Sequence, residues 1–459
     1  MSGDRLSPPD VDVCVVGRSL AAWVACRRLE RTGLDLRWVR PPSGSLASLW
    51  GGLGQVFGPS QPLLPDSAGA LEGRLDQPIS FDPAVELRWR RLSDRRTTTH
   101  PYSRLGLPRE QVSKHISRAL DLLDDLELAR ADDSSAVPGP HGAPYAVDIA
   151  AQSVRRRPFD PGTRLCVVGA GTLDSFRAEP TARRLDRAAQ LDAEVWNGPP
   201  FDELGDGTSH PVRAARSLWR AFESAGDSLF ASLAEHCRQR SIDVVLLPPC
   251  IGATFPTHRA IMEGLREVLP CEVAEMPAER DSIHGWRIDR ALRDEDSNTT
   301  IRRELQNLSV TDEGVELTAE SAEPFRAAAC LLATGGFFDG GLPAEAPVRE
   351  ELTGAPLWID GAPVDNTDEV FVPRLLDERP WNDHRLFRAG LAVDSDSRVL
   401  DRDGSPKSAA LFAAGRLLSG FNPIHDGCSM GVELASGLAA ADSLAAILPR
   451  TDDTSEGER

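Results

Sequence analysis

The chain has 459 residues, of which 41% are hydrophobic and 26% are charged, and its formal net charge is −19. This length is too great for one simple core, so we expect a folded, globular chain of two or three domains. The excess of acidic side chains argues against nucleic acid as a partner and against a polybasic membrane anchor, because both require positive charge.

The apolar segments and the cysteines limit the class of protein further. We find no apolar run of membrane-spanning length and no signal peptide, so we expect no direct membrane insertion. The eight cysteines include no Cys-x-x-Cys pair, and most of them lie in apolar runs. We therefore expect no metal or iron–sulfur site in this chain, and a reducing, cytoplasmic location.

The N-terminal segment has the pattern of a βαβ unit. An apolar strand ends at Gly17, a helix is predicted over residues 20–31, and a second strand over residues 34–39. A dinucleotide-binding fingerprint would have glycine at 17, 19 and 22, whereas this chain has Ser19 and Ala22 at the second and third positions. On spacing alone, nucleotide or flavin binding and a generic βαβ unit remain equal alternatives.

Arg40 follows the second predicted strand, where dinucleotide-binding proteins usually carry an acidic residue for the adenosine ribose. A guanidinium cannot accept a hydrogen bond from the ribose hydroxyls, because it has donors only. It pairs well with phosphate, which it can bind through two parallel hydrogen bonds. Arg40 is therefore a candidate contact to a phosphate group.

Two later apolar strands are also predicted to end in small-residue turns, one near residue 333 and one near residue 414. A turn-rich loop and a helix of small residues over about 431–448 follow the second of them. A helix start in this setting favours an anionic or polarised ligand, and an ordinary strand–helix connection is the alternative. The candidate ligand contacts are Thr334, Gly335, Gly415, Gly427, Cys428 and Gly431.

The middle of the chain contains an amphipathic segment and one more glycine turn. Residues 109–131 carry apolar side chains at helical spacing, which predicts a helix that packs on one face. A glycine turn follows the apolar strand at 165–168, where a second dinucleotide site and a structural turn are the alternatives. Asp174 would lie beside a bound pyrophosphate and repel it, which favours the structural turn.

Residues 282–287 are predicted as a loop that carries His284, Trp286 and Arg287. These three side chains could together face a ligand. The equal alternative is an arginine that binds loop carbonyls beside a packed tryptophan.

Several uncommon strings follow one another along the chain. They are HPYSRLG at 100–106, LPPCIG at 247–252, GWRI at 285–288, GGFFDGGL at 335–342 and the closing segment at 411–431. Over residues 10–448 the chain resembles one family, the B component of the anaerobic glycerol-3-phosphate dehydrogenase complex.

The resemblance implies an α/β fold of the Rossmann-like FAD/NAD(P)-binding flavoprotein class with an inserted second domain. Residues 10–100 and 300–450 would form the flavin-binding domain, and residues 101–299 an inserted cap or partner domain. The implied cofactor is a flavin. FMN is favoured over FAD because Arg40 suits its single phosphate. The expected cofactor contacts are Gly17, Ser19, Arg40, Thr334, Gly335, Gly415, Gly427, Cys428 and Gly431.

The resemblance also implies two partners, an FAD-containing catalytic sister subunit and an iron–sulfur membrane-associated subunit. Together they would oxidise glycerol 3-phosphate to dihydroxyacetone phosphate and pass electrons to quinone. The chain would then be cytoplasmic and peripheral to the inner membrane through a partner. The sequence has no evident catalytic set, and His100 and Arg287 are the candidates. The alternatives are a stand-alone flavin-dependent oxidoreductase and a scaffold subunit without flavin.

Overall fold

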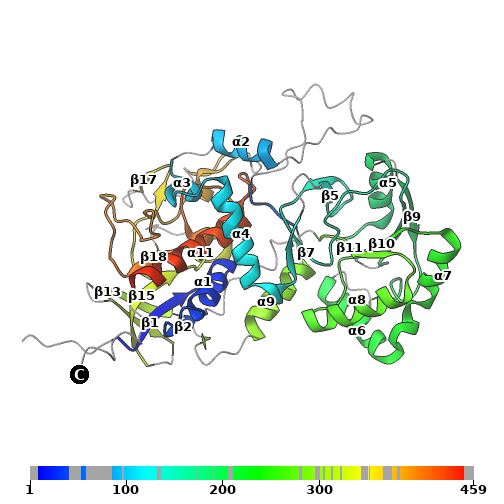
Figure 1. Cartoon of the computed structure of the whole chain (residues 1–459), viewed down its shortest axis with the longest axis horizontal. Coiled ribbons are helices and arrows are strands. Elements are labelled where there is room, and N and C mark those ends of the chain that lie inside the picture. The colour runs from blue at the N-terminus through cyan, green and yellow to red at the C-terminus, as the bar shows by residue number, and fades with distance from the viewer. Residues whose placement is uncertain are drawn as a thin grey trace, which may run out of the picture. The chain divides into compact units, whose positions relative to one another are not determined.

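Figure 1 shows the chain as a computed structural model, which divides into two compact units. Unit 1 comprises residues 1–45, 91–123 and 296–459, and unit 2 comprises residues 46–90 and 124–295. The structure describes residues 9–40, 53–57, 85–95, 98–131, 136–171, 173–189, 191–204, 210–278, 282–294, 300–302, 305–311, 314–320, 323–342, 350, 352–364, 375–379 and 383–448.

Unit 1 is built on a mixed sheet. Its strands are β1 Val11–Val16, β2 Leu36–Val39, β12 Thr300–Ile301, β13 Leu305–Thr311, β14 Gly314–Ala319, β15 Phe325–Leu332 and β18 Leu411–Ala413. The strand order is β12-β2-β1-β15-β14-β13, and β18 also pairs with β15. Strands β12, β2, β1, β15 and β18 pair in parallel, whereas β13, β14 and β15 pair antiparallel. The apolar character of β1 fits a strand that is buried on both faces.

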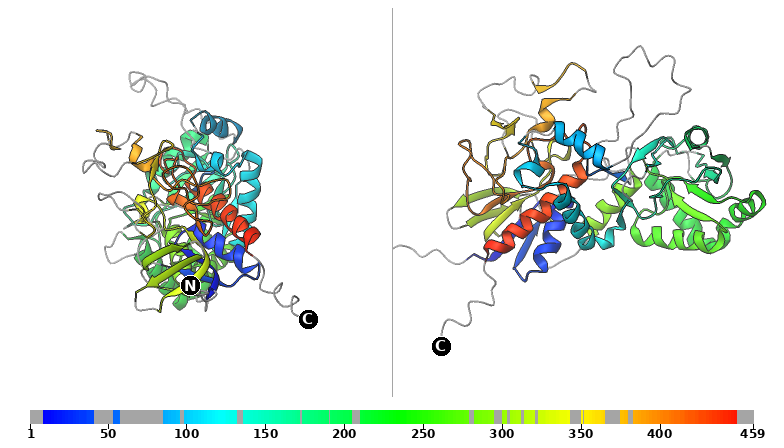
Figure 2. Two further views of the ribbon diagram at one scale, coloured as in Figure 1. Left: turned by 90° about the vertical axis from the view of Figure 1, so that its left-hand side faces the viewer. Right: turned by 45° about the horizontal axis from the view of Figure 1, so that its top comes forward.

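Two helices from opposite ends of the chain, α1 Leu20–Glu30 and α11 Ser429–Ile447, pack against each other in unit 1. Figure 2 shows them side by side along the sheet, α1 in blue and α11 in red. A side chain at Gly437 would lie 2.6 Å from the backbone oxygen of Ala21, so glycine is required for this close approach. The helices α3 Pro101–Arg104 and α4 Arg109–Leu122 also contact α11.

Helix α11 corrects one expectation from the sequence. Within the part of the chain that the structure describes, it is a helix long and apolar enough to cross a membrane. However, 67% of its apolar window is buried within the protein, and it packs on α1 and α4. Small residues let this helix lie deep in the core, which explains an apolar composition without lipid contact.

Unit 2 contains a parallel sheet with strand order β11-β10-β8-β9. Its strands are β8 Arg164–Val168, β9 Asp192–Trp196, β10 Val244–Leu247 and β11 Glu272–Glu275. The helices are α5 Ala178–Ala189, α6 Pro211–Ala225, α7 Ala231–Arg240, α8 Phe255–Val268 and α9 Ile283–Asp294. Smaller antiparallel pairings join β3 Leu53–Gly54, β7 Ile149–Ala151 and β4 Leu128–Arg130, and also β5 Ala136–Pro138 and β6 Pro144–Ala146.

The predicted helix over 109–131 is wrong in its second half. Helix α4 ends at Leu122, a short 3-10 turn covers Asp124–Leu126, and β4 follows. Glu127 between them has a φ of +51°, in the left-handed region, which a continuous helix cannot contain. The apolar spacing therefore continued past the helix because the following turn and strand are buried as well.

The predicted loop over 282–287 is also wrong, because α9 starts at Ile283. The Ser282 hydroxyl accepts hydrogen bonds from the backbone N–H groups of His284 (3.1 Å) and Gly285 (3.3 Å). Ser282 thus caps the helix, although histidine and glycine are weak helix formers.

The two units differ from the predicted domain limits of 10–100, 101–299 and 300–450 in two segments. Residues 46–90 group with unit 2, where the Arg88 guanidinium pairs with Asp148 and the N–H of Val56 donates to the same carboxylate at 2.7 Å. Residues 101–123 group with unit 1, because α4 packs on α11 and α1. These contacts link residues distant in sequence and are invisible to local composition.

Candidate functional site

Three strand-to-glycine turns meet at one edge of the unit 1 sheet. Because β1, β15 and β18 are parallel neighbours, their carboxyl ends lie together, as in other α/β sheets that bind ligands there. Gly17, Gly335 and Gly415 follow these strands with φ of +138°, +93° and +77°, conformations that favour glycine. The structure therefore brings the predicted turns together.

Gly17 and Ser19 connect the first turn to the second. A side chain at Gly17 would lie 2.1 Å from the carbonyl oxygen of Ala333, so the two backbones touch. The Ser19 hydroxyl donates to the same carbonyl at 2.9 Å and accepts from the N–H of Ala22 at 3.1 Å. Ser19 is thus the N-cap of α1. This explains why a serine can replace the second glycine of the fingerprint.

The start of α1 still offers hydrogen-bond donors to an anion. The backbone N–H groups of Ser19 and Ala21 have no hydrogen-bond partner among the residues that the structure describes. The N–H of Leu20, by contrast, donates to Oε2 of Glu433 at 3.1 Å. The first turn of a helix attracts negative charge, so part of it serves Glu433 and part remains for a ligand.

Glu433 belongs to a buried ion-pair chain that sequence reasoning missed. Nε of Arg416 lies 2.7 Å from Oε1 of Glu433, and Nη2 of Arg416 lies 2.9 Å from Oδ1 of Asp339. Burial raises the pKa of both carboxyl groups, Glu433 and Asp339, although the guanidinium opposes this effect. The one signal in the sequence is an acid within a helix of small, apolar residues, α11.

Arg40 is buried behind the first turn. Its guanidinium lies over the indole of Trp38, 4.6 Å from the ring centre, and the indole Nε1 donates to the carbonyl of Gly17 at 2.9 Å. The structure therefore places Arg40 in the layer directly next to Gly17, stacked on an aromatic ring.

The other side of this edge has features that fit the polar rim of a flavin ring. The hydroxyl of Thr334 is buried and has no hydrogen-bond partner among the described residues. Helix α11 starts after Cys428 without a side-chain cap, so its first N–H groups and its dipole are available to a ligand. Gly427, with a φ of +54°, makes the turn into this helix. The residues present fit a flavin at these positions.

His100, a catalytic candidate, holds this loop in place. Its Nδ1 accepts from the N–H of Tyr102 at 3.1 Å, and its Nε2 lies 3.5 Å from Sγ of Cys428. The ring is buried and packs on Tyr102 and Phe421, with ring centres 5.0 and 6.0 Å apart. His100 is therefore a positioning residue for the Cys428 loop.

Arg287, the other candidate, lies in unit 2 and not with these residues. It forms a two-pronged ion pair with Glu275 at 2.9 and 2.8 Å, and it donates to the carbonyls of Gly252 at 3.0 Å and of Ile251. Although burial alone would raise it, the guanidinium holds the pKa of Glu275 well below its usual range. The alternative of an arginine that binds loop carbonyls is thus the one observed.

Comparison with known families and relatives points to the same edge. A family model described as an FAD binding domain matches residues 307–432, which contain the second and third turns and the start of α11. Among curated proteins, the B component of Yersinia enterocolitica anaerobic glycerol-3-phosphate dehydrogenase is 25% identical over 63% of this chain and 67% of its own length. The chain resembles the B component of anaerobic glycerol-3-phosphate dehydrogenase. Its counterpart from Yersinia pestis is 27% identical over 62% of this chain and 65% of its own.

A solved structure, the 3-ketosteroid delta1-dehydrogenase from Sterolibacterium denitrificans, overlaps with 95% of this chain and 99% of its own. Its sequence identity is 11% and its TM-score 0.36. An overlap this weak supports no conclusion. The matched FAD-binding domain confirms the predicted flavoprotein fold and a flavin as the cofactor class. With the relatives' names it supports a flavin-dependent oxidoreductase. The preference for FMN over FAD finds no support in this match.

Proposed function

We propose that this chain is the FAD-binding subunit of a glycerol-3-phosphate dehydrogenase complex that delivers electrons to quinone. The observation that carries the proposal is the convergence of Gly17, Gly335 and Gly415 at one sheet edge, inside a unit whose second half matches an FAD-binding domain. The matched relatives are named as a subunit of such a dehydrogenase, which supports the assignment to a complex.

A bound flavin supplies two-electron acceptance from a reduced donor and stepwise release to an acceptor. Toward that group, the N–H groups of Ser19 and Ala21 would bind phosphate, with Arg40 adding positive charge behind them. The N-terminus of α11 would stabilise negative charge on the ring, and the Thr334 hydroxyl would hydrogen-bond to its polar edge.

The titratable groups at this edge are already engaged within the protein. Glu433 and Asp339 pair with Arg416, and His100 is enclosed between Tyr102, Phe421 and Cys428. Paired and buried groups are poor general acids or bases for a substrate. We therefore assign oxidation of glycerol 3-phosphate to a catalytic sister subunit, and to this chain the transfer of electrons toward an iron–sulfur subunit. Its location would be the cytoplasmic side of the membrane, through that partner.

A flavin-free scaffold subunit is the second candidate, and one observation favours it. Glu433 occupies the N–H of Leu20, one of the donors at the start of α1. Ser429 and Met430 also add side chains to the loop that turns into α11. A scaffold would bind the same partners and hold no flavin.

Co-expression with a tagged catalytic sister subunit and an iron–sulfur subunit tests the proposal. We expect all three chains to purify together, and glycerol 3-phosphate to reduce flavin associated with this chain in the complex. Reduction confined to the sister subunit's flavin would support the scaffold. Failure of this chain to join the other two would overturn the assignment to the complex.

A further inference from the structure

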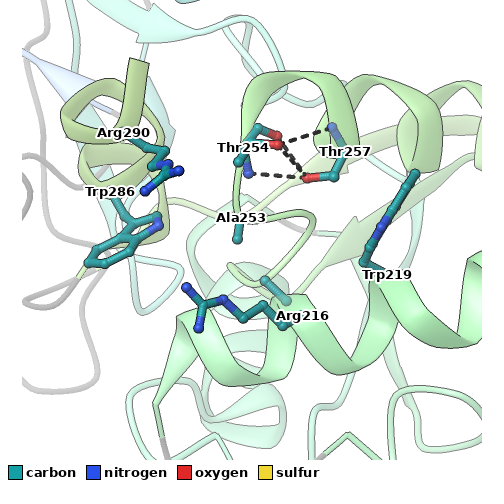
Figure 3. Close-up of a pocket in the computed structure, with 8 residues that line it drawn as sticks. Arg216, Trp219, Ala253, Thr254, Thr257, Trp286 and Arg290 are labelled. Atoms are coloured by element: carbon teal, nitrogen blue, oxygen red, sulfur yellow. Dashed lines mark hydrogen bonds between the residues drawn. The ribbon is translucent and has the colours of Figure 1, made fainter. Parts of the chain in front are cut away.

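Unit 2 contains a pocket that the flavin proposal does not use (Figure 3). It has a volume of about 230 Å³ and lies where α6, the start of α8 and α9 meet. Its lining combines two arginines, two tryptophans, two threonines and two alanines, namely Arg216, Arg290, Trp219, Trp286, Thr254, Thr257, Ala215 and Ala253.

Both arginines direct their guanidinium groups toward this space, from different helices (Figure 3). Arg216 forms no hydrogen bond or ion pair with any residue that the structure describes. Arg290 uses its Nε for Asp294, at 2.7 Å, which leaves its terminal nitrogens available. None of the eight lining residues is acidic, although the chain as a whole carries a net charge of −19. Two converging cations without an acid between them favour an anionic ligand.

The remaining walls suit the other parts of a small organic anion. The indoles of Trp219 and Trp286 stand on opposite sides of the pocket and offer flat apolar surface (Figure 3). The hydroxyls of Thr254 and Thr257 lie 3.0 Å apart at the start of α8, where either can act as the donor. They can therefore also bind a hydroxyl or an oxyanion of a ligand.

The pocket is held in shape by the buried arginine next to Trp286. Arg287 donates to the carbonyls of Ile251 and Gly252, directly before the lining residues Ala253 and Thr254. Its pairing with Glu275 fixes the start of α9 against the end of β11. A site on rigid, pre-positioned elements loses less entropy when it binds a ligand.

We propose that this pocket binds a small phosphate monoester. A monoester carries nearly two negative charges at neutral pH, which matches two guanidiniums, whereas a single carboxylate would leave one unpaired. The volume is below the roughly 300–1,000 Å³ of pockets for drug-sized ligands, so a dinucleotide is too large. The site stands independently of the flavin proposal, because none of its residues belongs to unit 1.

Titration of the purified full-length chain tests the site, with tryptophan fluorescence and calorimetry as the readouts. The probes are glycerol 3-phosphate and inorganic phosphate, with glycerol as the uncharged control. We expect saturable binding of both phosphates below about 1 mM and none of glycerol. Arg216→Gln and Arg290→Gln should each weaken binding about tenfold, the usual effect of losing one charged hydrogen-bond partner.

Arg220→Gln is the matched control, because it removes the same charge from the exposed face of α6 outside the pocket. It should change the affinity less than about twofold. Trp286→Phe should reduce the fluorescence response while calorimetry still detects binding. An equal loss in all three arginine variants would reveal diffuse attraction and overturn the site, as would a lack of saturation at about 10 mM phosphate. Either failure would leave the flavin content of the chain, and so the proposed function, unaffected.

Discussion

The sheet edge of unit 1 and the Arg287 region of unit 2 illustrate two ways in which a sequence presents a site. At the sheet edge, backbone geometry makes the site, because glycine turns follow parallel strands. In unit 2 neighbouring side chains have opposite roles, since Arg287 is buried in an ion pair while Trp286 and Arg290 line a pocket. Glycine turns can be recognised in a sequence, whereas the direction of a side chain cannot.

The largest expected effect is on the buried ion pair of unit 2. Arg287→Met leaves Glu275 charged and enclosed, so we expect the free energy of unfolding to fall by about 3–5 kcal/mol. Urea denaturation measures it. Replacing both partners, as Glu275→Leu with Arg287→Met, should recover much of that loss, because no unpaired charge remains. A single variant as stable as the parent chain would show that the pair is not closed to water.

The backbone contact of unit 1 comes next. Gly17→Ala would place a side chain 2.1 Å from the oxygen of Ala333, so we expect a loss of about 3 kcal/mol in the free energy of unfolding. Gly33 is the control, because its φ is +81° and nothing lies within 4 Å of an added side chain. Gly33→Ala should cost only about 1 kcal/mol. Equal losses would mean that the contact between the two turns contributes nothing.

The acid sensitivity of unit 2 gives an intermediate effect. Burial lowers the pKa of His284 to about 4, so between there and its unfolded value of about 6.5 the unfolded chain binds more protons. Stability therefore falls as the pH drops from 6.5 to 4, by about 3 kcal/mol from this residue. His284→Gln should make the stability profile flatter in that window. An unchanged profile would contradict the enclosed position of the ring.

The smallest effect on stability is expected at the unpaired hydroxyl of unit 1. Thr334→Val removes a buried group that has no partner among the described residues, so the free energy of unfolding should change by less than about 0.5 kcal/mol. The affinity for FAD should fall about tenfold if that hydroxyl binds the cofactor. Flavin fluorescence quenching measures the affinity, and an unaltered value would remove Thr334 from the site.

The sequence predicted the local elements of the flavin site well. The helix expected over 20–31 is α1 Leu20–Glu30, and the strand expected over 34–39 is β2 Leu36–Val39, because periodicity and glycine turns are local signals. It did not predict the ion pairs that join Glu433, Arg416 and Asp339, since these depend on which elements meet in the fold.

The middle of the chain was harder to predict for the same physical reason. His284 and Gly285 are weak helix formers, yet the Ser282 cap and the pairing of Arg287 stabilise α9. Arg216 and Trp219 are unremarkable on an amphipathic helix and become a candidate site only beside α8 and α9.

The central claim is that this chain holds FAD, and the flavin content of the purified protein tests it most directly. The protein is purified, denatured to release any flavin, and the flavin is separated by chromatography and quantified against protein concentration. We predict one FAD per chain, or one per chain after incubation with FAD. A colourless protein that cannot be reconstituted with FAD would contradict the claim, and FMN in its place would show that Arg40 was the better guide.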